Sequence, residues 1–143
     1  MNKQEFIEAL NEDLTTEYRS IIQYIQHVSS VKGAKYQQTL KELDKHLSQE
    51  LSHAMTLAKQ IDFLGGQASN AVQPFQTETD PEKALRQDLR VEEGQLERYR
   101  ARVEQAAELG LPDVAEALAP LLEQTQDHIR ELRAALGGAA GRL

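Results

Sequence analysis

The sequence contains no cysteine among its 143 residues, which excludes disulfide bonds and thiolate metal sites. Any transition-metal site must therefore be built from His, Asp and Glu side chains. The chain also lacks a run of about 18–20 apolar residues, the length that crosses a membrane. Its N-terminal stretch, MNKQEFIEALNEDL, has no apolar core of the signal-peptide kind. These absences predict a cytoplasmic protein without a membrane partner.

Basic residues are outnumbered, with 16 Lys and Arg against 23 Asp and Glu, and the formal net charge is −7. This balance argues against nonspecific binding to nucleic acid, which needs a basic surface. It suits a protein that attracts cations. The length suits one domain, which we place over residues 1–143.

Alternating β-branched segments are absent, and apolar residues recur instead at steps of three and four. That period is typical of amphipathic helices packed nearly parallel to one another. The pattern predicts an all-α protein with helices over residues 3–31, 34–64, 81–109 and 112–136. The Gly- and Ala-rich tail, residues 137–143, is expected to fray.

The links between these helices differ in length. Short links after the first and third helices predict two antiparallel hairpins. The link over residues 65–79 is much longer and extends to about 50 Å. A helix of roughly 30 residues is about 45 Å long, so this link is expected to cross the whole bundle. Pro120 predicts either a kink or break in the last helix or a late start near that residue.

The two hairpins resemble copies of one another, related by one constant offset along the sequence. This repeat offset is the separation between Leu10 and Leu85. Helix packing alone explains the matches between apolar residues, but not those between polar ones. The matching pairs include Leu10 and Leu85, Asp13 and Asp88, Leu14 and Leu89, Glu17 and Glu92, Tyr24 and Tyr99, Leu43 and Leu118, and His53 and His128.

Three glutamates, Glu17, Glu50 and Glu92, stand where the helical period calls for leucine. Burying a bare carboxylate is costly, and three at one level repel one another. A cation between them removes both costs. His53 and His128 add nitrogen ligands, and mixed carboxylate and imidazole ligation suits Fe, Mn or Zn.

The spacing supports a metal site. Glu50-x-x-His53 places both side chains on one helix face. Glu17 precedes Glu50 by the same number of positions as Glu92 precedes Thr125, so each hairpin brings its two positions to matching heights. Helix bundles hold two metals with one Glu from each of two helices and Glu-x-x-His from the other two.

On these residues the sequence resembles the ferritin-like superfamily, and bacterioferritins most closely, from Leu10 to Leu136. The resemblance implies a four-helix bundle of two hairpins joined by a long crossover loop. The residues that carry it are Leu10-Asn11-x-x-Leu14-x-x-Glu17 with Gln23-Tyr24, Glu50-x-x-His53, Asp88-Leu89-x-x-Glu92 with Tyr99, and His128.

The resemblance also implies roles. Glu17, Glu50 and His53 are expected around a first metal. Glu92 and His128 are expected around a second, with Glu50 shared between the two. Family members bind O₂ or peroxide at an iron pair and oxidise Fe(II), so iron is the expected metal, with Mn or Zn as alternatives.

The chain departs from the family pattern at Thr125, where a second bridging glutamate is expected. Three carboxylates leave two divalent ions with a formal charge of +1. Three outcomes are open: a pair completed by water or an anion, a single metal near Glu17, Glu50 and His53, or a degenerate site. Asp127 and Glu123 lie on other faces of an unbroken helix and do not replace the carboxylate.

Other polar and sulfur-containing side chains are interpreted without a ligand role. Haem-binding bacterioferritins carry Met directly after the helix 2 glutamate, whereas this chain has Leu51, so we predict no haem. Met55 is predicted to lie in the core and His27 on the surface. His46 is predicted to lie on the surface or beside the ligands, and both repeat-matched tyrosines to be core aromatics with bonded hydroxyls.

The leading hypothesis is a metal-binding protein with ferroxidase or peroxide-consuming activity. The alternative, motivated by Thr125, is a metal-free helical bundle that acts as an oligomeric scaffold or binding protein. The acidic charge argues against a DNA-protecting relative. A homodimer or larger homo-oligomer is expected, because long amphipathic bundles often pair.

Overall fold

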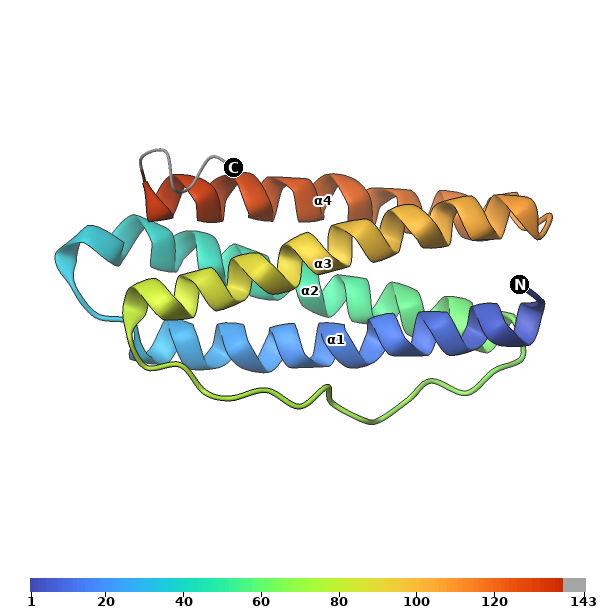
Figure 1. The fold of residues 1–143 in the computed structure, drawn as a ribbon, viewed down its shortest axis with the longest axis horizontal. Coiled ribbons are helices and arrows are strands. Elements are labelled where there is room, and N and C mark those ends of the chain that lie inside the picture. The colour runs from blue at the N-terminus through green and yellow to red at the C-terminus, as the bar shows by residue number, and fades with distance from the viewer. Residues whose placement is uncertain (138–143) are drawn as a thin grey trace.

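Four long helices make up most of residues 1–137, the part of the chain that this computed structural model describes (Figure 1). They are α1 (Lys3–Ser30), α2 (Gln37–Phe63), α3 (Pro81–Glu108) and α4 (Pro112–Leu136), with a short 3₁₀ helix, η1 (Ala34–Tyr36), before α2. The predicted all-α class and the four helices are confirmed. Among these helices, none has the length and apolar character needed to cross a membrane. All but the first residue of the tail predicted to fray lies outside the described residues.

The helix ends follow local sequence signals. At the start of α1, the Asn2 side chain accepts a hydrogen bond from the Glu5 backbone N–H at 2.8 Å, and the Glu5 side chain accepts one from the Asn2 backbone N–H at 2.9 Å. This reciprocal pair satisfies two otherwise unpaired donors. Asp80 caps α3 in a similar way, accepting from the Lys83 N–H at 3.1 Å. After α2, Gly65 has a φ of 89°, a conformation that favours glycine.

The long link between α2 and α3, residues 64–80, runs the length of the bundle alongside α1 (Figure 1). Asn11 of α1 anchors it with its side-chain amide, which donates to the Gln67 carbonyl at 3.0 Å and accepts from the Ser69 N–H at 2.7 Å. Because α1 packs mainly on α2, and α3 mainly on α4, the predicted pair of hairpins joined by a crossover is confirmed.

Helix α4 continues unbroken through Pro120, so the predicted late start or local break is wrong. Proline removes one backbone donor and leaves the carbonyl four residues earlier, that of Glu116, without its helical partner. Both residues lie on the exposed side of α4. Water can hydrate that carbonyl, and the helix therefore tolerates the proline.

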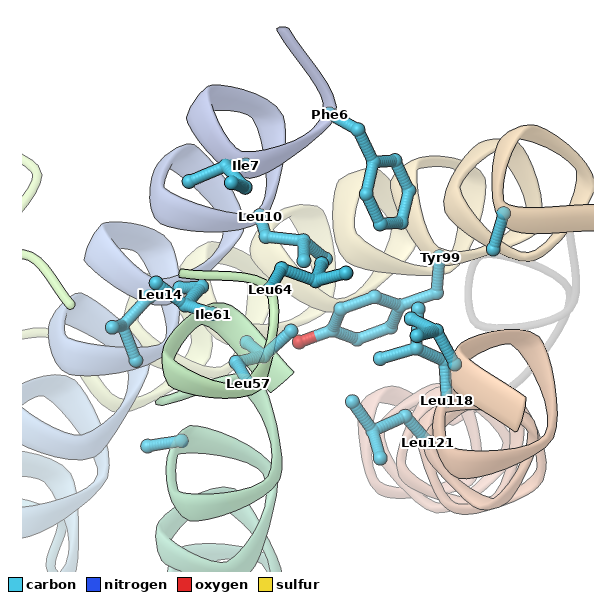
Figure 2. Packing of buried hydrophobic residues seen from close by; sticks show 13 residues of the cluster. Phe6, Ile7, Leu10, Leu14, Leu57, Ile61, Leu64, Tyr99, Leu118 and Leu121 are labelled. Carbon is cyan, nitrogen blue, oxygen red and sulfur yellow. The ribbon is translucent and has the colours of Figure 1, made fainter. Parts of the chain in front are cut away.

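The interior is divided into two apolar clusters with a polar layer between them. One cluster lies toward the start of α1 and includes Tyr99 (Figure 2). The other includes Tyr24, Leu43 and Ile129. The buried glutamates and histidines come from the middle of the helices, and the two clusters close this layer off from both ends of the bundle.

Candidate metal centre

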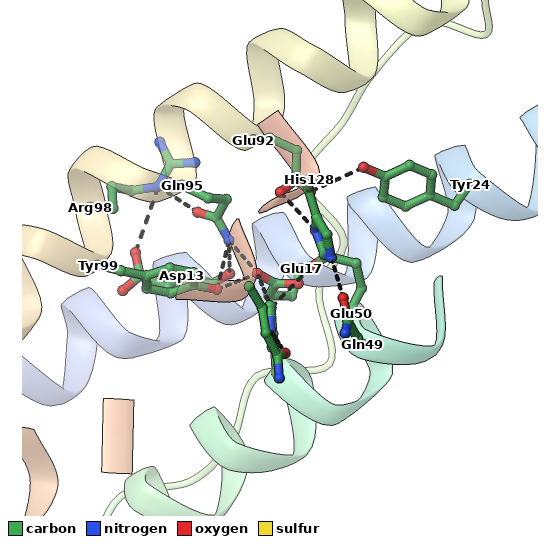
Figure 3. A network of polar contacts seen from close by, with 12 residues as sticks. Asp13, Glu17, Tyr24, Gln49, Glu50, Glu92, Gln95, Arg98, Tyr99 and His128 are labelled. Carbon is green, nitrogen blue, oxygen red and sulfur yellow. Dashed lines mark hydrogen bonds and ion pairs between the residues drawn. The ribbon is translucent and has the colours of Figure 1, made fainter. Parts of the chain in front are cut away.

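The structure brings all five predicted site residues together in the middle of the bundle, and Figure 3 shows Glu17, Glu50, Glu92 and His128 among them. Each of them is at most 1% exposed. They form two overlapping groups in which the ligand atoms lie within 4.8 Å of one another. We call Glu17, Glu50 and His53 the first triad, and Glu50, Glu92 and His128 the second triad.

Glu50 lies between the two histidines and presents one carboxylate oxygen to each. Its Oε2 is 3.4 Å from His53 Nδ1, and its Oε1 is 3.1 Å from His128 Nδ1. Glu17 Oε1 lies 3.8 Å from His53 Nδ1, and Glu92 Oε2 lies 3.1 Å from His128 Nδ1. The carboxylate of Glu50 is therefore placed to be shared between two cations.

Two atoms of the first triad lack hydrogen-bond partners, which makes the triad suitable for a metal ion. Glu17 Oε2 and His53 Nδ1 are buried, and neither has a hydrogen-bond partner within residues 1–137. Leaving a buried polar atom unpaired costs about 1–3 kcal/mol. A cation bound between these atoms would remove that cost, and the oxygen and imidazole donors suit Fe, Mn or Zn.

The three carboxylates do not ionise together. Burial raises the pKa of Glu50 well above its usual range, and the charges of Glu17 and Glu92 raise it further. Burial also opposes ionisation of Glu92, but its hydrogen bonds with Glu50 and His128 outweigh burial and lower its pKa to about 2. Burial likewise opposes ionisation of Glu17, but the nearby Glu50 and His53 outweigh burial and lower its pKa. In the metal-free protein, Glu50 therefore holds the proton that a bound cation would displace.

Tyrosine hydroxyls support the two outer carboxylates, and both tyrosines lie in the core with bonded hydroxyls as predicted. Tyr24 donates to Glu92 Oε1 at 3.2 Å, and Tyr99 donates to Glu17 Oε1. Burial and then the neighbouring carboxylates raise the pKa of both phenols well above the usual value, so both remain donors. Gln95 adds a second donor to Glu17, with its Nε2 at 2.8 Å from Oε1 (Figure 3).

Thr125 occupies the position where a fourth carboxylate was expected, and it is 1% exposed. The neighbouring acids point elsewhere: Asp127 pairs with Arg130 at 2.7 Å, and Glu123 is exposed. Thus neither Asp127 nor Glu123 supplies the missing carboxylate. The second triad keeps two carboxylates, and one of these is shared with the first.

The prediction that His27 lies on the surface is wrong. His27 is 0% exposed, and its Nδ1 lies 2.8 Å from Asp88 Oδ2 across the α1–α3 contact. The matching contact in the other half joins Asp13 Oδ2 to Arg102 Nε at 2.9 Å. The match between Asp13 and Asp88 was a signal for both contacts, since His27 and Arg102 are separated by the same repeat offset.

His46 lies beside the ligands and not on the surface. It is 1% exposed. Its ring stacks on that of His128, with 4.1 Å between centroids, and its Nε2 is 3.0 Å from Glu131 Oε2. Burial and then the neighbouring His128 lower the pKa of His46 to about 4, so the ring is neutral at physiological pH.

The prediction that Met55 lies in the core is also wrong, because Met55 is 60% exposed. The buried side of α2 is formed by residues such as Glu50, Leu57 and Ile61, and Met55 lies on the opposite side. Leu51, one turn earlier, is 50% exposed on the same outer side.

Two glutamines that sequence reasoning missed contact the ligand histidines. Gln124 Oε1 lies 2.7 Å from His53 Nε2, and Gln49 Oε1 lies 2.6 Å from His128 Nε2. The two glutamines are separated by the repeat offset, so the internal repeat contained the signal that identifies them.

Comparisons with known proteins point to one family of helical bundles. The family model described as the ferritin-like domain matches residues 7–140. A solved ferritin-like, di-iron-carboxylate protein from Bacillus anthracis str. Ames is 33% identical. Its alignment covers 94% of this chain and 97% of that one, with a TM-score of 0.88.

Two bacterioferritin structures have the same fold. One, from Rhodobacter capsulatus, is described with a metal-free dinuclear site and haem iron; it is 25% identical over 93% of this chain and 84% of its own, with a TM-score of 0.83. The other, a mycobacterial bacterioferritin, is 23% identical over 91% of this chain and 81% of its own, with a TM-score of 0.82. A search of curated proteins found no match.

The raised pKa of Glu50 predicts how stability depends on pH in the metal-free protein. Folding holds a proton on Glu50 that the unfolded chain, with a usual pKa of 4.5, releases. Stability therefore falls as pH rises from 4.5 through the folded pKa. Glu50→Gln keeps the shape without the charge and should be more stable than wild type at pH 8 by about 1–3 kcal/mol, with a smaller difference at pH 5.

Urea unfolding of chelator-treated protein at these two pH values measures the difference. Glu92, with its pKa lowered to about 2, contributes the opposite slope below pH 4.5, outside this window. A Glu50→Gln variant that is less stable than wild type at pH 8 would contradict the protonation of Glu50.

Proposed function

Because this chain belongs to the ferritin-like domain family, we propose that its buried carboxylates and histidines bind iron and support the oxidation of Fe(II). The observation that carries the proposal is the pair of unpartnered buried atoms, Glu17 Oε2 and His53 Nδ1. A site that held no cation would leave both atoms desolvated without compensation. The description of the Bacillus anthracis protein as a di-iron-carboxylate protein favours iron over Mn or Zn.

In this proposal the first triad binds one metal, the second triad binds another, and Glu50 is shared. Bound Fe(II) supplies the electrons that reduce O₂ or peroxide. The chain's own contribution is to hold the donors in place without water. Tyr24 and Tyr99 orient Glu92 and Glu17 through hydrogen bonds, and Glu50 gives up its proton when a cation takes its place.

We propose that the protein binds iron but no haem, because it has Leu51 at the position where haem-binding relatives carry methionine. The haem iron described for the Rhodobacter capsulatus bacterioferritin belongs to that protein.

A metal-free scaffold is the second candidate function, and Thr125 is the observation that favours it. A site that lacks a bridging carboxylate has fewer anionic ligands and binds divalent ions more weakly. The candidates differ in what Glu50 does: in a scaffold it is an unneeded buried acid, and its removal would be neutral or stabilising under all conditions. In a metal protein, its removal also abolishes the stabilisation that a bound metal provides.

Metal content tests the proposed function directly. After Fe(II) loading in air and removal of free iron, elemental analysis should find between one and two metals per chain, because three carboxylates leave two divalent ions with a net positive charge and weaken binding of the second. Fe(II) or Zn(II) should also raise the unfolding temperature of wild type and not that of Glu50→Gln. Recovery without metal, together with no stabilisation by either ion, would support the scaffold instead.

Replacing Thr125 with glutamate should restore the missing carboxylate. Because the fourth negative charge neutralises two divalent ions, Thr125→Glu should bind the second Zn(II) about 10–100-fold more tightly and be less stable than wild type without metal. Isothermal titration measures the first effect and urea unfolding the second. Gln126→Glu, an exposed neighbour on α4, is the control for added charge. Equal effects of the two variants would contradict this account of Thr125.

Self-association is the last part of the proposal. Leu51 and Met55 on α2 and Ile25 on α1 leave large apolar side chains exposed, and symmetric pairing is the usual way to cover such side chains. Light scattering should give a multiple of the 16.1 kDa chain mass. Leu51→Glu combined with Met55→Glu should shift the mass toward one chain, and a wild type that is monomeric at micromolar concentration would contradict self-association.

A further inference from the structure

Each histidine of the two triads is held from the opposite helix by a glutamine. His53 is on α2, and its Nε2 lies 2.7 Å from Oε1 of Gln124 on α4. His128 is on α4, and its Nε2 lies 2.6 Å from Oε1 of Gln49 on α2 (Figure 3). The contacts therefore cross between the helices: each glutamine is close in sequence to the histidine of one triad but touches the histidine of the other.

These contacts place a proton on Nε2 of each ring. An amide oxygen only accepts hydrogen bonds, so the histidine must donate from Nε2. The other nitrogen, Nδ1, faces the carboxylates in both rings, at 3.4 Å from Glu50 in His53 and at 3.1 Å from both Glu50 and Glu92 in His128. The atom that points toward the metal position is thus Nδ1. The glutamine fixes the ring in this orientation through its hydrogen bond with Nε2 on the opposite side of the ring.

We propose that Gln49 and Gln124 are positioning residues that keep each histidine ring oriented with Nδ1 toward the metal position, each acting on the triad that contains the histidine of the opposite helix. This inference rests on the proposed function, since it concerns how the same site is prepared for a cation. A neutral amide suits the task because it orients the ring without adding a charge beside three carboxylates. The two glutamines are separated by the repeat offset, so both halves of the bundle contain the same hydrogen bond between a glutamine and a ligand histidine.

The first test reads the histidine tautomers in metal-free, ¹⁵N-labelled protein by long-range ¹H–¹⁵N correlation. Methionine has a similar size and offers no comparable acceptor. Gln124→Met should change the Nε2–H pattern of His53 and leave His128 unchanged, and Gln49→Met should do the reverse. Gln126→Met, exposed on α4, should change neither. Unchanged tautomers, or a change confined to the histidine on the same helix as the substitution, would overturn the proposal.

The second test measures Zn(II) affinity of one triad at a time, by competition with a chelator. His128→Ala leaves the first triad, and His53→Ala leaves the second. In the His128→Ala background, Gln124→Met should weaken binding about 10–100-fold and Gln49→Met should leave it within twofold. In the His53→Ala background, the pattern should be reversed.

Glutamate in place of either glutamine keeps an acceptor at the same reach, so Gln124→Glu and Gln49→Glu should restore the affinity that methionine removes. A purely structural role would instead weaken both triads equally and would not be rescued. Wild type that binds no Zn(II) would contradict the proposed function, while the tautomer experiment would still decide the role of the glutamines. If the His128→Ala and His53→Ala variants do not fold, the tautomer experiment alone decides the role of the glutamines.

Discussion

The arrangement of this bundle depends on one constraint, the burial of three carboxylates at a single level between two apolar clusters. Glu17, Glu50 and Glu92 are each 1% exposed, and three such charges cannot share the interior without a proton or a cation among them. The surrounding residues reduce the cost of burial, because two tyrosine hydroxyls and a glutamine amide donate hydrogen bonds to the outer carboxylates. The raised pKa of Glu50 shows where the protein keeps its proton when no cation is present.

Much of this could be predicted from the sequence, because the apolar period identifies the helices and the internal repeat identifies matching positions in the two halves. Glu17 and His53 stand out where leucine would pack, and the match with Glu92 and His128 identifies the second half of the site. The wrong predictions concern which side of a helix individual residues occupy. His27 reads as a surface residue until α3 brings Asp88 against it, and the position of Met55 depends on which side of α2 faces the core. The contact of His27 is made between helices, and the sequence of one helix does not contain it. The three-four period through Glu50, Leu57 and Ile61 does place Met55 on the outer side of α2, and that prediction missed this signal.

The internal repeat is also the best guide to where the site is asymmetric. The tyrosines, the outer glutamates, the histidines and the glutamines beside them all recur at the repeat offset, whereas Glu50 is matched by Thr125 and His46 by Leu121. Both exceptions affect the second triad: one removes a carboxylate, and the other stacks a neutral imidazole against His128. The half of the site that lost charge is therefore also the half whose histidine stacks on a second buried imidazole.

This asymmetry gives the two metal positions different roles in the proposed function. The first triad has a carboxylate of its own, a histidine with an unpartnered Nδ1, and one oxygen of Glu50. The second has Glu92 and His128, which already contact each other at 3.1 Å, and the other oxygen of Glu50. A cation at the first position would displace the proton that Glu50 holds. The two positions would share this carboxylate, and three carboxylates would leave two divalent ions with a net positive charge, so the second ion would bind more weakly than the first.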